Sequence, residues 1–210
     1  MVKGIITGDI VDSTHIPTEF KEEIQKVLKA VVDDFTPSVS LSYEMYRGDS
    51  FQFVVDKAEH ALSVAIAIRT ALKAHTPKTL EQWDARIAIG IGTVSFNSSS
   101  ILTSDGEAFQ LSGREFDCLG KRRLSIVTPW SDINEELKLS TLFADDIISK
   151  WTIKQSEIVY ATIFSNMVQK EQAQKFGMSV QNISKHWNLA KGSLINQYIN
   201  RFKEIINKQK

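Results

Sequence analysis

A short turn that carries a carboxylate constrains the fold of this chain more than any other stretch. Its centre is Gly48 and Asp49, and apolar and polar residues alternate on both sides of it, over residues 39–46 and again over residues 51–55. Alternation with a period of two is typical of β-strands, and a glycine turn between two such runs is typical of a β-hairpin. The sequence therefore predicts a hairpin with Asp49 at its tip.

The other parts of residues 1–130 carry further strand and helix patterns. Strands are predicted over residues 3–11, 86–94 and 124–127, which are rich in β-branched and apolar side chains. Helices are predicted over residues 18–35, 57–75 and 106–119, where apolar residues recur every three or four positions. The order strand, helix, strand, strand, helix, strand, with additions, is the split βαβ pattern of a ferredoxin-like sandwich, which is an α+β fold.

The C-terminal part of the chain differs from this pattern in charge. Residues 168–210 hold eight Lys or Arg against two Glu, although the whole chain of 210 residues has a formal net charge of zero. A basic module indicates an anionic partner. We therefore divide the chain into residues 1–130, a connecting helical segment at residues 131–154, and a small all-α domain at residues 155–210.

The small domain has the spacing of a helix-turn-helix. The two helices can cross closely because small and apolar residues stand at the crossing: Ala173, Gly177 and Ile183. The predicted N-cap of the second helix is Ser179. Four side chains at the front of that helix could read bases in a DNA major groove: Val180, Gln181, Asn182 and Lys185. Five basic residues could contact DNA phosphates: Lys170, Lys175, Lys191, Arg201 and Lys203. The alternative is a helical dimerisation tail with a solvated basic face.

Composition excludes several classes of protein. A lone cysteine, Cys118, rules out an internal disulfide framework and the usual cysteine-rich zinc sites. No segment approaches the roughly 18 consecutive apolar residues of a membrane span, so we expect a cytoplasmic protein with no membrane partner. Nothing in the sequence calls for an organic cofactor.

Asp9 near the N-terminus and Asp49 at the hairpin tip form a candidate metal site. Two carboxylates on neighbouring strands suit Mg²⁺ or Mn²⁺, which fills its remaining positions with water and phosphate oxygens. The alternative is that Asp49 only forms the turn and Asp9 only caps the segment that follows it.

Four stretches in a fixed order resemble a known family. They are residues 8–14 (GDIVDST), 48–51 (GDSF), 86–92 (RIAIGIG) and 106–114 (GEAFQLSGR). Together they look like the signature of class III nucleotidyl cyclases over about the first 120 residues, and most of the chain is similar to the SatD-like group of bacterial proteins.

The cyclase resemblance implies roles for particular residues. Asp9 and Asp49 would hold the metal ions, with the backbone carbonyl of Ile10 as a further ligand. Arg114 would stabilise charge on the phosphates in the transition state, and Gln110 stands where the family has an asparagine that orients the ribose. In cyclases these two groups meet across a two-fold axis, so the resemblance also implies a homodimer with shared sites.

The chain departs from the cyclase pattern at the base-reading positions. Met45 replaces a lysine, and a methionine cannot donate a hydrogen bond to a purine; the partner position holds Thr103. We therefore expect a bacterial DNA-binding regulator whose cyclase-like domain binds a divalent metal and a nucleotide or another phosphorylated ligand. The ligand-binding residues would be Arg47, Gly48, Gln110 and Arg114. The alternative is an active divergent cyclase, in which Arg114 and Gln110 are catalytic.

Overall fold

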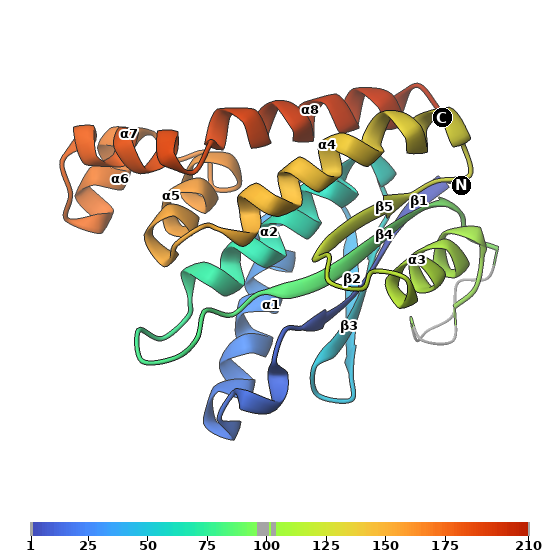
Figure 1. Cartoon of the computed structure of the whole chain (residues 1–210), viewed down its shortest axis with the longest axis horizontal. Helices are drawn as coiled ribbons and strands as arrows, with labels where there is room; N and C mark the ends of the chain where they lie inside the picture. Colours follow the sequence, from blue (N-terminus) through green and yellow to red (C-terminus); the bar gives the residue numbers. More distant parts are fainter. Residues whose placement is uncertain (1, 96–100, 102–103, 210) are drawn as a thin grey trace.

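A mixed five-stranded sheet forms the centre of the computed structural model, which describes residues 2–95, 101 and 104–209 (Figure 1). Within these residues the strand order is β2-β3-β1-β4-β5. The strands are β1 (Val2–Ile10), β2 (Leu41–Tyr46), β3 (Ser50–Val55), β4 (Ala85–Thr93) and β5 (Leu124–Val127).

Strand pairing fixes the neighbours of each residue near the hairpin tip. β2 and β3 pair antiparallel, which confirms the predicted hairpin, and β1 lies antiparallel between β3 and β4. β5 is parallel to β4. This register sets Asp9 opposite Ser50 on one side and opposite Arg86 on the other.

Helices cover both faces of the sheet (Figure 1). They are α1 (Lys21–Phe35) and α2 (Ala61–Ala74) on one face and α3 (Glu107–Asp117) on the other. α3 packs very closely on β4, because a Cβ atom at Gly90 would lie only 2.3 Å from the carbonyl oxygen of Ala108 and 2.5 Å from the backbone nitrogen of Ser112. The glycines of β4 thus allow α3 to pack closely against the backbone of the strand.

Five further helices follow β5 in the chain. They are α4 (Ser131–Ser149), α5 (Ile153–Ile163), α6 (Gln169–Phe176), α7 (Val180–Leu189) and α8 (Gly192–Asn207). α4 and α8 lie side by side along the upper edge of Figure 1, and α5 packs against α2. α8 also covers the short 3-10 helix at Ala58–His60.

One apolar core joins the sheet to the C-terminal helices. It extends from Ile6 on β1 through α2 to Phe202 and Ile206 on α8. The boundaries that the sequence suggests at residues 131–154 stay a prediction, but the helices after them share the core of the sheet. No helix in the part of the chain that the structure describes has the length and apolar character needed to cross a bilayer.

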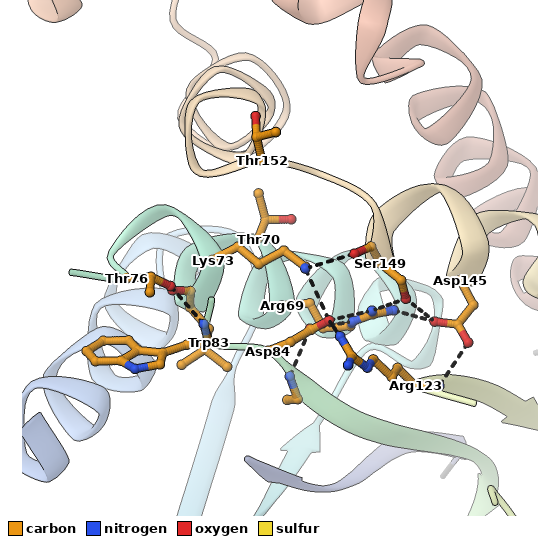
Figure 2. A network of polar contacts seen from close by, with 12 residues as sticks. Arg69, Thr70, Lys73, Thr76, Trp83, Asp84, Arg123, Asp145, Ser149 and Thr152 are labelled. Atoms are coloured by element: carbon orange, nitrogen blue, oxygen red, sulfur yellow. Dashed lines mark hydrogen bonds and ion pairs between the residues drawn. The ribbon is translucent and has the colours of Figure 1, made fainter. Parts of the chain in front are cut away.

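A buried ion network ties α4 to α2 and to the start of β4 (Figure 2). Arg69 on α2 donates from Nε and Nη2 to the two oxygens of Asp84, both at 2.8 Å, and from Nη1 to Asp145 on α4 at 2.7 Å. Lys73 and Arg123 contact Asp84 at 3.3 and 2.9 Å. Burial alone would raise the pKa of Asp84, but the charges and hydrogen bonds of Arg69, followed by Lys73 and Arg123, outweigh it and lower that pKa to about 2.

Candidate functional site

The hairpin tip and the end of β1 meet at one end of the sheet. The backbone N–H of Ile10 donates to the carbonyl oxygen of Asp49 at 3.0 Å. The hydroxyl of Ser13 donates to the Asp49 carboxylate at 2.7 Å. The end of β1 with Asp9 and the turn with Asp49 are therefore adjacent, although the two residues are far apart in the sequence.

Asp9 already has a cationic partner within the chain. Arg86 on β4 donates from Nε to one Asp9 oxygen at 3.0 Å and from Nη2 to the other at 2.5 Å. The same guanidinium lies 5.4 Å from the centre of the Phe116 ring on α3. The hydrogen bonds to Asp9 raise the pKa of Arg86 despite some desolvation. The sequence analysis missed this pair, because only the register of β1 on β4 brings the two residues together.

Tyr46, the last residue of β2, lies in the electrostatic field of both aspartates. Burial is the largest cause of the raised pKa of its phenol, Arg47 opposes the shift, and Asp9, Asp49 and Asp117 add to it. The phenol is therefore a neutral hydrogen-bonding group beside an acidic region.

The residues present fit a divalent metal ion only in part. Among the residues that the structure describes, no group of three or more His, Cys, Asp or Glu could hold a metal ion. Asp49 keeps coordination capacity, since its second oxygen accepts only a long bond of 3.3 Å from Ser50. Asp9 would become a ligand only after Arg86 had left it. The predicted roles of Asp9, Asp49 and the Ile10 carbonyl as ligands stay predictions.

A pocket of about 170 Å³ has Asp49 in its wall and is lined by both polar and apolar residues, the apolar ones being Ile10, Ile16 and Ile24. Lys21 at the start of α1 and Arg47 in the hairpin loop supply positive charge, and Ser13 and Thr14 line the same space. Arg47 has a left-handed backbone with φ of 54°. That conformation costs a residue other than glycine about 1–2 kcal/mol. A strained arginine beside a lysine and two hydroxyl-bearing residues is suited to binding an anion.

The predicted transition-state residues lie on α3, outside this pocket. Gln110 and Arg114 are exposed, and Gln110 donates to Asp105 at 3.4 Å. Among the described residues, neither side chain contacts Asp9 or Asp49. Met45 is half-buried against the apolar core, whereas Thr103 lies outside the described residues.

The predicted DNA-reading residues are all accessible at the surface. α6 ends at Gly177, whose φ of 62° is left-handed, and α7 begins after Ser179, whose hydroxyl accepts the N–H of Asn182 at 3.2 Å. Ile183 is fully buried and holds α7 in place. Seven side chains remain exposed: Lys170, Lys175, Val180, Gln181, Asn182, Lys185 and Lys191. Their contacts with DNA stay a prediction.

Comparisons with known proteins give a family and several similar folds. No curated protein matches this chain. A bacterial light-regulated adenylyl cyclase is 15% identical, with 60% of this chain and 74% of that chain covered and a TM-score of 0.41. The guanylyl cyclase domain of the RhoGC fusion protein from the aquatic fungus Blastocladiella emersonii is 17% identical, with coverages of 55% and 73% and a TM-score of 0.43.

The active GGEEF domain of a diguanylate cyclase from Vibrio cholerae is 15% identical, with coverages of 62% and 85% and a TM-score of 0.40. These similarities concern the fold, and no activity follows from them. The family assignment is firmer, because one family model spans nearly the whole chain. With residues 4–201 matched by the SatD family model, the chain belongs to the SatD family.

Proposed function

We propose that this protein is a cytoplasmic regulator in which a cyclase-like sheet unit binds a phosphorylated compound and the C-terminal helices bind DNA. The strand order β2-β3-β1-β4, antiparallel throughout, supports a ferredoxin-like sandwich of the split βαβ type for the sheet unit. The single observation that carries the proposal is the pocket that Lys21, Arg47 and Asp49 line together.

The pocket supports phosphate as the chemical group that is bound. Lys21 and Arg47 line the pocket and would make charge-assisted hydrogen bonds to phosphate oxygens, and Gly48 leaves the backbone accessible. Mg²⁺ or Mn²⁺ would bind Asp49 together with the phosphate, and Asp9 as a second ligand if a phosphate drew Arg86 away. Gln110 and Arg114, exposed on α3, would serve the ligand of a second copy in a homodimer with shared sites.

The helix pair α6 and α7 supports DNA as the second partner. The capped start of α7 presents Gln181, Asn182 and Lys185 to solvent, and these side chains match the donors and acceptors of base edges. The core that α5 and α8 share with α2 gives a physical path between the two sites.

Calorimetric titration with inorganic triphosphate and with each nucleoside triphosphate, in the presence of Mg²⁺, tests the ligand site. Lys21→Ala and Arg47→Ala should each weaken binding about tenfold, the loss expected for one charge-assisted contact. Lys29→Ala is the matched control, because Lys29 is exposed on the same helix but does not line the pocket. Unchanged affinity in both pocket variants would remove the ligand proposal. Formation of a cyclic nucleotide would instead identify an active cyclase.

A gel shift with the DNA upstream of the protein's own gene tests the second site. Asn182→Ala and Lys185→Ala should weaken binding, whereas Asn196→Ala, an exposed asparagine on α8, should not. If the wild-type protein fails to bind any DNA at low salt, the DNA proposal is wrong, because the electrostatic contribution needs no particular sequence.

A further inference from the structure

One side of α7 faces away from the rest of the protein. α6 and α7 lie at one end of the molecule, beyond the sheet (Figure 1). At 100° per residue, Gln181, Lys185 and Asn188 fall within about 60° of one another around the helix axis, and all three are exposed. The opposite side of the helix carries Ile183, which is fully buried. The three exposed side chains form the outer row of α7.

The outer row is accessible to a negatively charged partner. Among the residues that the structure describes, none of its three side chains makes a hydrogen bond or an ion pair, and α7 has no acidic residue. The helices packed against α7 are α5, α6 and α8, each with one acidic residue. These residues have partners within the protein: Glu157 pairs with Lys154, Glu171 accepts the backbone N–H of Val168 at 3.1 Å, and Glu204 lies 3.5 Å from Arg201.

The outer row places one ammonium group between two amides. A Gln or Asn amide can make two hydrogen bonds to adenine, and a lysine can make them to guanine. At 1.5 Å per residue, Lys185 lies about 6 Å from Gln181 and about 4.5 Å from Asn188 along the helix axis. Successive base pairs of DNA are about 3.4 Å apart, so these separations correspond to about two steps and about one step.

We infer that α7 reads a segment of about four base pairs in a major groove, with A·T at the first pair, G·C at the third and A·T at the fourth. The segment is counted from the end at which Gln181 lies, and the inference rests on the DNA binding proposed above. Gln181 contacts the first adenine, Lys185 the guanine and Asn188 the second adenine. Asn188 is therefore a further residue that determines specificity, whereas Asn182, about 100° around the helix from Gln181, contacts one wall of the groove.

Selection from random duplex DNA tests the inference. The full-length chain is incubated at low salt with duplexes that are randomised at their centre, and the bound DNA is sequenced. The wild type should enrich the segment described above. Gln181→Ala, Lys185→Ala and Asn188→Ala should lower the preference about tenfold at the first, third and fourth pair, and each should leave the other two pairs unchanged.

Two controls separate sequence preference from affinity. Asn196→Ala, at an exposed asparagine on α8, is matched to Asn188→Ala and should select the wild-type segment. Lys170→Ala, on α6, should weaken binding to all sequences alike, because a phosphate contact carries no sequence information. All of these positions are exposed, so the variants should fold, and circular dichroism checks this.

A change of preference is a sharper test than a loss. Lys185→Gln should change the preferred third pair from G·C to A·T in a competition gel shift, because the amide of glutamine pairs with adenine. A damaged fold would weaken binding to both duplexes and would not exchange their order. An unchanged preference for G·C in this variant would contradict the role of Lys185.

The outcomes distinguish this inference from the proposed function. If the chain binds DNA at low salt but selects no segment, or if the three outer-row variants keep the wild-type preferences, the inference is wrong and DNA binding is retained. If the chain binds no DNA at low salt, the DNA-binding function is wrong as well, because the electrostatic contribution needs no particular sequence.

Discussion

Replacing Asp84 by asparagine removes the charge on which the buried ion network depends. The Asp84 carboxylate is fully buried and contacts Arg69, Lys73 and Arg123, so asparagine would leave these cations without their common partner. Loss of one member of a buried ion pair costs about 3–5 kcal/mol. We expect the free energy of unfolding of Asp84→Asn to fall by about that amount at pH 7, as measured by urea denaturation.

The matched control is Asp56→Asn. Asp56 also pairs with a lysine, Lys3 at 2.7 Å, but its side chain is 41% exposed. An exposed pair of this kind contributes less than about 1 kcal/mol. If Asp84→Asn and Asp56→Asn lose similar amounts of stability, the network does not hold α4 to the sheet as we infer.

The difference in stability between wild type and Asp84→Asn should also depend on pH. The pKa of Asp84 is about 2 in the folded protein, below the ordinary value for an aspartate. Its stabilising contribution is therefore present above about pH 4 and is lost as the pH falls towards 2. From the pKa difference, that part amounts to about 2 kcal/mol. The stability difference between wild type and Asp84→Asn should shrink over this range, and a constant difference would refute the reasoning.

Four other substitutions have defined outcomes. Arg86→Ala should strengthen Mn²⁺ binding in calorimetry, because it frees both Asp9 oxygens; unchanged binding would mean that Arg86 does not compete with a metal. Gly90→Ala should lower the free energy of unfolding by about 1–3 kcal/mol, since the added methyl group meets backbone atoms of α3, whereas Gly113→Ala, with open space around it, should raise it by up to about 1 kcal/mol. Trp151→Phe removes the 2.7 Å hydrogen bond from the indole to the carbonyl of Ala190 and should cost about 1–2 kcal/mol; an unchanged urea midpoint would contradict this.

Local patterns were sufficient to predict the hairpin and most of the strands and helices. The alternation around Gly48 and the three-to-four spacing in α1 depend on neighbouring residues, so one sequence reveals them. The Asp9–Arg86 pair could not be predicted, because its members are separated by 77 positions and meet only through strand register. The link from Arg69 to Asp145 spans 76 positions and has no sequence signal either.

The apolar composition of α2 indicates more about its surroundings than the sequence analysis inferred from it. The sequence analysis predicted this helix from apolar residues that recur every three or four positions, but the structure buries every residue from Ala61 to Lys73. Apart from Ser63, Arg69, Thr70 and Lys73 these residues are apolar, and apolar residues on more than one side are typical of a helix that is covered from both directions. This composition could have indicated that the C-terminal helices fold back over the sheet unit.

The packing of α5 and α8 on α2 and its neighbouring turn determines how the protein can be divided. A fragment that ended near residue 150 would expose the outer surface of α2 to water, and isolated C-terminal helices would lose the partner of Phe202 and Ile206. Neither fragment would keep a closed core. In the regulator that we propose, a signal between the phosphate site and the DNA site would therefore travel as small shifts of packed helices rather than as the swing of a domain on a flexible linker.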